Sequence, residues 1–141
     1  MKHLFVFVLM LGYLNNIHAQ EPSDKIVGTW INEDKSSKIE IYKAGDAYAG
    51  KIVWISAMDS NPGLQPKDKN NPKPELRNRD ILGMDIITGL KYSSGKWING
   101  TLYTPKRGMY ADCRVELLTN GQLKVSGSKS GFTKSQLWTR P

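Results

Sequence analysis

The fold class is decided by the stretch Met109-Tyr-Ala-Asp-Cys-Arg-Val-Glu-Leu117, along which apolar and polar side chains alternate. The odd-numbered positions are apolar or small, and the even-numbered positions carry a tyrosine and three charged residues. A period of two residues is typical of a β-strand that has one face on a core and the other in water. We therefore predict a half-buried strand at this position.

Similar runs and turn signals surround this strand. Asn120-Gly121 follows it, and an Asn-Gly pair between two alternating runs favours a hairpin because both residues tolerate a positive φ. Further strands are predicted within residues 25–30, 38–43, 48–57, 81–92, 97–103, 122–128 and 133–139, and no helix is expected. About eight strands joined by hairpins favour one antiparallel up-and-down barrel, since closure removes exposed edges. The predicted class is all-β.

Residues 1–19 have the composition of a secretory signal peptide. Lys2 and His3 precede the apolar run Leu4–Leu14, and Ala19 precedes the expected cleavage point. The apolar run is shorter than the roughly 20 residues that a membrane-spanning helix needs. We therefore expect an exported protein, periplasmic or extracellular, with a single domain over residues 20–141 and no transmembrane segment after cleavage.

Loss of this segment would remove both histidines, His3 and His18, from the mature chain. Ser-His-Asp and Cys-His nucleophile systems would then be excluded, and zinc or copper sites would lose their commonest ligand. The single cysteine, Cys113, has no partner for an internal disulfide, and its inward position predicts a small core residue. We predict a protein that is not an enzyme and that uses no metal or cofactor.

One segment, Met58–Arg79, interrupts the strand pattern. It contains four prolines, five basic residues and three acidic residues, with little apolar content. Such a composition buries little surface, which favours a mobile, solvated loop, although loops of this length also serve as functional lids. Its basic side chains are an excess of positive charge that an anionic lipid or envelope polymer could contact. They are Lys67, Lys69, Lys73, Arg77 and Arg79.

Both ends of the mature chain resemble the lipocalin or calycin arrangement, in which an early tryptophan is packed by a late basic residue. The mature chain also resembles the secreted bacterial family called domain of unknown function 2147. The matching motifs are Gly28-x-Trp30, Asn71-Pro72, Leu76-Arg77-Asn78-Arg79, Gly83, Gly89-Leu90, Trp97-x-x-Gly100, Tyr103-x-Pro105, Gly108-x-Tyr110 and Gln136-x-Trp138-x-Arg140. The resemblance implies export from a bacterial cell and a calycin-like barrel closed by Trp30, Trp138 and Arg140. It implies no activity.

The first functional hypothesis is a non-catalytic binding barrel for a small apolar or amphiphilic ligand. The interior of an eight-stranded barrel is either filled by side chains or occupied by one small ligand. The residues expected to line the site are Ile52, Trp54, Met84, Ile86, Tyr103, Met109 and Cys113. The alternative for these residues is an ordinary filled core.

Two other hypotheses remain open. An envelope interaction module would use the basic loop and the outer surface, with a filled barrel. A hydrolase built on carboxylates alone would use a pair of acids such as Asp80 and Asp85. Export argues against nucleic acid as a partner.

Overall fold

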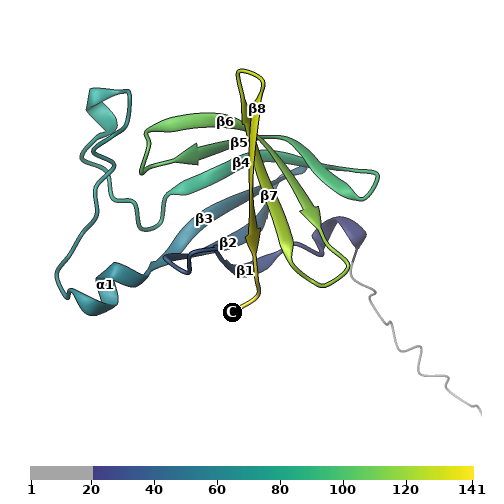
Figure 1. The fold of residues 1–141 in the computed structure, drawn as a ribbon, viewed down its shortest axis with the longest axis horizontal. Coiled ribbons are helices and arrows are strands. Elements are labelled where there is room, and N and C mark those ends of the chain that lie inside the picture. Colours follow the sequence, from purple (N-terminus) through teal and green to yellow (C-terminus); the bar gives the residue numbers. More distant parts are fainter. Residues whose placement is uncertain (1–20) are drawn as a thin grey trace, which may run out of the picture.

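The computed structural model describes residues 21–141, so the predicted signal peptide lies outside the described residues. Eight strands form one antiparallel sheet in which each strand pairs with the next along the chain (Figure 1). The strands are β1 (Gly28–Ile31), β2 (Ser37–Ala44), β3 (Ala47–Ile55), β4 (Asp85–Ser93), β5 (Lys96–Thr104), β6 (Met109–Leu117), β7 (Leu123–Lys129) and β8 (Phe132–Trp138). The predicted all-β class and antiparallel up-and-down order are confirmed.

The sheet curls until its first and last strands meet at one residue pair. Ile31 of β1 and Thr139, which follows β8, form an isolated antiparallel bridge. The two backbone hydrogen bonds of this bridge measure 2.8 and 3.0 Å. The two strands meet only at this end of β8, and the other end of β8, at its hairpin with β7, lies away from β1 (Figure 1). The barrel is therefore closed at one end by a short contact.

Side chains fill this closed end. Trp30 and Trp97 are buried, and their indole N–H groups donate to the backbone carbonyls of Ile26 and Ser23. Ser23 belongs to η1, a single 3-10 turn (Pro22–Asp24) that packs here before β1 begins. The Tyr48 hydroxyl hydrogen-bonds to Asp24 of the same turn. The buried tryptophans thus keep their polar atoms paired while they fill the barrel.

The residues predicted to close the barrel lie at this end. The Arg140 guanidinium lies 3.9 Å from the centre of the Trp30 ring. It also donates to the backbone carbonyls of Lys25, Val27 and Thr29. Trp138 is buried as well, between the filled end and the open part of the barrel. The last strand is thereby fixed to the chain around the first one, as the lipocalin resemblance implied.

Strand β4 departs from the alternation that the sequence predicts. The pattern places Met84, Ile86, Thr88 and Leu90 on one face, but Thr88 is exposed and its neighbour Ile87 is buried. The reason is that the pairing of β3 with β4 is irregular at two places, between Tyr48 and Gly50 and between Gly50 and Lys51, and each adds one residue to β4. A bulge adds a residue to one strand and thereby shifts the inward face.

The expectation of no helix is wrong in detail. A single turn of α-helix, α1 (Ser56–Ser60), continues from β3 into the long loop. The loop also contains η2, a 3-10 turn (Pro74–Leu76) that begins at a proline. Across residues 21–141, none of the helices has the length and apolar character needed to cross a membrane.

Candidate functional site

A cavity of about 1080 Å³ opens at the end of the barrel where the β5–β6 and β7–β8 turns lie. Ligand sites in proteins commonly measure about 300–1,000 Å³, so the space suits a small molecule. Most of its apolar wall comes from the inner side of the sheet. These residues are Ile39, Ile52, Ile55, Ile81, Ile86, Leu102, Ala111, Val125 and Trp138. The barrel is therefore filled at one end and hollow at the other.

The mouth of the cavity is strongly basic. Six residues of the cavity lining carry a positive charge, and one residue of the lining, Asp34, is acidic. The six are Lys67, Lys69, Lys106, Arg107, Lys129 and Lys134. Lys67 is neutralised by Asp80 at 2.5 Å. The remaining five give this rim an excess of positive charge, which attracts anions.

Asp34 supplies one negative charge against these five cations. Hydrogen bonds from the Ser36 hydroxyl and backbone N–H are the main reason that the pKa of Asp34 is lowered. The charge of Lys106 contributes a smaller part of the same shift. Asp34 is therefore an anion already held by its own turn.

The long loop forms one side of the mouth because it is anchored by a buried carboxylate. Asp68 accepts hydrogen bonds from the Tyr103 hydroxyl (2.6 Å), the Asn71 amide (2.8 Å) and Arg79 Nε (2.9 Å). Burial opposes the charge, but these three bonds outweigh it and lower the pKa of Asp68. Asn71 is buried too. The expectation of a solvated loop is thus wrong for its middle, because a local polar network replaces the apolar contacts that the composition lacks.

A second contact clamps the loop onto the β5–β6 turn. The Asn70 side-chain amide donates to the Lys106 carbonyl at 2.9 Å. Opposite it, Gly108 has a φ of +62°, and a Cβ there would lie 1.8 Å from the Asn70 carbonyl oxygen. Glycine at this position permits the close approach. The contact brings Lys69 and Lys106 to the same rim.

Four of the predicted lining residues border the cavity, namely Ile52, Ile86, Tyr103 and Met109. Met109 is 42% exposed and lies at the mouth. The Tyr103 hydroxyl donates its proton to Asp68, so it is not available as a donor to a ligand. Whether the four residues contact a ligand stays a prediction.

The predicted inward position of Trp54 is wrong. β3 has one extra residue, Val53, opposite the step from Lys38 to Ile39. Trp54 therefore pairs with Lys38 and shares its outer face. The Lys38 ammonium lies 4.9 Å from the centre of the Trp54 ring, and the indole N–H donates to Asp59. Ile55 borders the cavity instead.

Met84 and Cys113 are buried in the apolar core and are absent from the cavity wall. Cys113 is 2% exposed, and burial raises the pKa of its thiol to about 12. A thiol with so high a pKa is a poor nucleophile at neutral pH. The structure thus favours the expected core role of Cys113 over its expected place in a ligand site.

The two acids of the hydrolase hypothesis have different partners. Asp80 pairs with Lys67, whereas Asp85 accepts a 2.6 Å hydrogen bond from the Tyr42 hydroxyl. Neither carboxylate belongs to the cavity wall. Their geometry offers no paired acid in the hollow part of the barrel.

Residues 28–140 match the model of a protein family described as "Uncharacterized protein conserved in bacteria (DUF2147)". The chain is also similar to a solved structure titled "Protein HP1028 from the human pathogen Helicobacter pylori belongs to the lipocalin family". That similarity has a TM-score of 0.71 and 24% sequence identity and covers 82% of each chain. The likeness shows a shared fold and confirms the predicted lipocalin-like class. No curated protein matches the chain.

Proposed function

The chain belongs to the DUF2147 family of bacterial proteins, and from this premise we propose that it is an exported, non-catalytic protein that holds one small amphiphilic ligand in its barrel. The hollow end carries this proposal. A volume of about 1080 Å³ with apolar walls is larger than ordinary packing leaves inside a domain of this size. The lipocalin-like fold supports a binding role but names no ligand.

The division of the barrel into a filled and a hollow end supports the same role. Trp30, Trp97 and the apolar residues around them supply a core at the closed end. The same apolar cluster continues into the cavity wall through Ile52, Ile86 and Val125. Replacement of apolar contacts by an open space costs stability, so a cavity of this size favours a functional purpose.

The side chains near the cavity support a non-catalytic role. Cys113 is buried with a raised pKa, and Asp68 is committed to three hydrogen-bond donors. Neither group is free to act as a nucleophile or a general base. Export rests on the composition of residues 1–19 and is part of the proposal.

The envelope-module hypothesis has less support from the loop. Arg79 bonds to Asp68, and Arg77 Nε donates to the backbone carbonyl of Asn71. Two of the five basic residues of the loop thus hold its own conformation. That hypothesis also requires a filled barrel, which differs from the cavity described above.

Binding of N-phenyl-1-naphthylamine, a neutral apolar fluorophore, tests the proposal. We expect enhanced and saturable fluorescence with the parent protein. Ala111→Trp and Ile55→Trp place a large ring in the cavity wall and should abolish the signal. Thr88→Trp adds the same ring on the exposed side of β4 and should leave it unchanged.

Absence of saturable binding in a parent protein with a native circular dichroism spectrum would overturn the container role. Native purification followed by solvent extraction and mass spectrometry gives a second, independent result. A stoichiometric small molecule in the extract would identify the ligand class directly.

A further inference from the structure

Lys134 is exposed, and it lies on the face of β8 that borders the cavity. Every second residue of a strand shares a face, so Lys134 lies on the face of β8 that also carries the buried Trp138. It pairs with Gly127 of β7, and both residues border the cavity. On this face, Trp138 is buried and apolar, whereas Lys134 is charged and exposed at the mouth.

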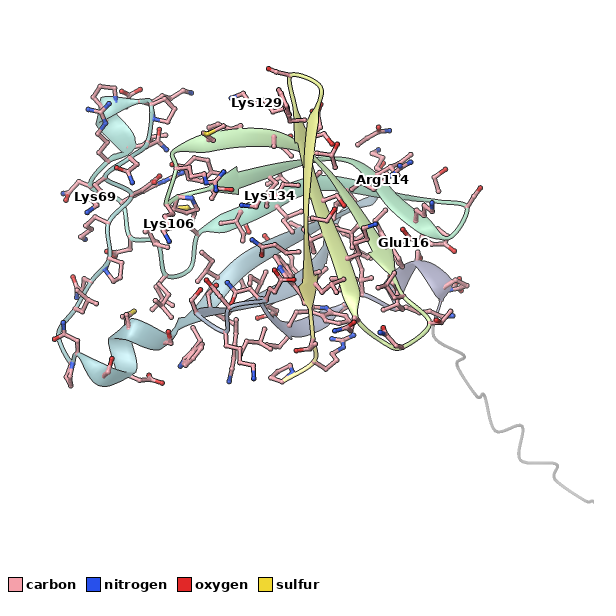
Figure 2. All side chains as sticks on the ribbon, viewed as in Figure 1. Lys69, Lys106, Arg114, Glu116, Lys129 and Lys134 are labelled. Carbon is pink, nitrogen blue, oxygen red and sulfur yellow. The ribbon has the colours of Figure 1, made fainter. Side chains whose placement is uncertain are left out.

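A second inward lysine lies beside it. On β7, Lys129 shares the face of Val125 and Gly127 and pairs with Phe132. Lys106 and Lys69 complete the group from the β5–β6 turn and the long loop. Figure 2 shows Lys69, Lys106, Lys129 and Lys134 over the part of the barrel away from Arg114 and Glu116. With Arg107 of the same β5–β6 turn, five cations from four segments thus border one opening.

In the part of the chain that the structure describes, the four lysines of this group (Lys69, Lys106, Lys129 and Lys134) form no salt bridge with an acidic residue. Asp34, the acid of the cavity wall, interacts with the charge of Lys106 but is hydrogen-bonded to Ser36. Like charges that gather without counter-charges destabilise a fold, unless an external anion joins them.

An inward lysine also has a structural explanation, because a charge on an edge strand discourages the addition of another strand. One lysine on β8 suffices for that role. It does not account for Lys106 and Lys69, which lie outside the edge strand. The convergence at the mouth therefore needs a further reason.

We propose that the barrel takes an amphiphile with an anionic head group, whose head binds Lys134 and Lys129 at the mouth while its apolar part lies against the inner wall. This proposal rests on the container role proposed above and adds the ligand class. A carboxylate, sulfate or phosphate head fits equally, since each accepts charge-assisted hydrogen bonds from ammonium groups.

The strand geometry also sets the length of the apolar part. Lys134 and Trp138 are four residues apart on β8, and a strand rises about 3.3 Å per residue. Lys134 at the mouth and Trp138 at the inner end of the cavity are therefore separated by roughly 13 Å along the strand. A linear chain of medium length, such as that of dodecanoate, spans this distance.

Competition against the neutral fluorophore separates the head group from the tail. The competitors are dodecanoate, dodecyl phosphate, dodecan-1-ol and dodecyltrimethylammonium, each used below its micelle-forming concentration. We expect the two anions to displace the fluorophore at concentrations at least about tenfold lower than the alcohol, as charge-assisted bonds imply. The cation should compete worst. The ranking of carboxylate against phosphate distinguishes the two head-group sources.

Variants assign the effect to the inward lysines. Lys134→Gln and Lys129→Gln should each reduce the anion-to-alcohol preference severalfold, whereas Lys134→Arg should retain it. Lys124→Gln removes one charge from the exposed side of β7 and is the matched control, which should keep the preference. Added salt should weaken dodecanoate and leave dodecan-1-ol unaffected.

The outcomes separate this proposal from the container role. If the fluorophore binds but all four head groups compete equally, the anionic class is overturned and the container stands. If Lys124→Gln lowers the preference as much as Lys134→Gln does, general surface charge explains it and the inward site is overturned. If the parent protein binds no fluorophore, both proposals fail.

Discussion

The Tyr103 hydroxyl donates a 2.6 Å hydrogen bond to Asp68, which lies 35 residues earlier in the sequence. This bond joins the long loop to β5. Tyr103 and its neighbour Leu102 face opposite sides of the sheet, so the loop is attached on the side opposite to Leu102. The ring centres of Tyr103 and Tyr110 lie 4.6 Å apart. The Arg79 guanidinium lies 5.6 Å from the centre of the Tyr103 ring. One tyrosine thus connects the wall of the cavity with the loop at its mouth.

The first prediction concerns this bond. Tyr103→Phe leaves the buried Asp68 with one donor fewer and should lower the free energy of unfolding by about 1.5–3 kcal/mol, as for a hydrogen bond to a charged group. Tyr42→Phe breaks a comparable bond to Asp85, but at an exposed site, and should cost less than about 1 kcal/mol. Urea denaturation measures both. Equal losses would show that the burial of Asp68 has no energetic consequence.

The same tyrosines predict a loss of stability in alkali. Hydrogen bonding to Asp85 raises the pKa of Tyr42, and burial followed by the Asp68 bond raises that of Tyr103, each from 10.0 to about 12. A raised pKa means that the folded state holds its proton while the unfolded state loses it. Stability is then fully present below about pH 10 and falls as the pH rises toward 12.

Denaturation midpoints between these pH values measure the slope, and ultraviolet absorbance reports tyrosinate directly. The parent should lose stability more steeply than Tyr103→Phe or Tyr42→Phe, and the double variant should be flattest. A slope that neither substitution changes would contradict the assignment.

The strand order and the closed end were predictable from the sequence, since both depend on local signals. Alternation, hairpin residues and the early and late motifs around Trp30 and Arg140 are visible in the chain itself. The face of Trp54 was not predictable in this way. It depends on the extra residue Val53 in β3, because a one-residue shift in register moves the following side chains to the other face.

For the loop and the basic mouth, prediction from the sequence fell short for different reasons. Composition predicted a solvated loop because Asp68 and Asn71 are polar, and only the fold supplies Tyr103 as a partner of Asp68. Lys134 is different. Its alternation with Gln136 and Trp138 in the last strand was available in the sequence and would have placed a lysine on the inner face.

A third prediction uses two glycines to test the clamp on the loop. Gly108 and Gly121 have φ values of +62° and +86°, so alanine is strained at both. A Cβ at Gly108 meets Asn70, whereas one at Gly121 has no atom within 4 Å. Gly108→Ala should therefore destabilise more than Gly121→Ala, by about 1 kcal/mol or more in thermal or urea unfolding.

Hydrogen exchange locates the effect of that substitution. In the parent, the amides of Asp68 and Ile81 donate to the carbonyls of Arg79 and Pro66, and both should exchange slowly. Gly108→Ala should accelerate exchange around Asn70, and Gly121→Ala should not. Fast exchange at Asp68 in the parent would restore the picture of a loop that is mobile throughout.

The fourth prediction concerns the closed end. Trp30→Ala removes a fully buried ring and should cost roughly 3–5 kcal/mol. Arg140→Lys keeps the charge but loses the planar fork that reaches the carbonyls of Val27 and Lys25, so it should also destabilise. Arg114→Lys, on the exposed side of β6, is the matched control and should be nearly neutral. A neutral Arg140→Lys would contradict a closing role for the last strand.

The last prediction separates core from cavity on a single strand. Cys113 and Ala111 both face inward on β6, but only Ala111 borders the cavity. Cys113→Phe should therefore overpack the core and cost about 1–3 kcal/mol, with fluorophore binding retained by the molecules that fold. Ala111→Phe should do the reverse, because the ring enters open space, displaces the ligand and leaves stability within about 1 kcal/mol of the parent. Urea denaturation and fluorophore titration on the same two proteins measure both properties. If Ala111→Phe were as destabilising as Cys113→Phe, the space beside β6 would be packed in solution, and the barrel would be filled along its whole length.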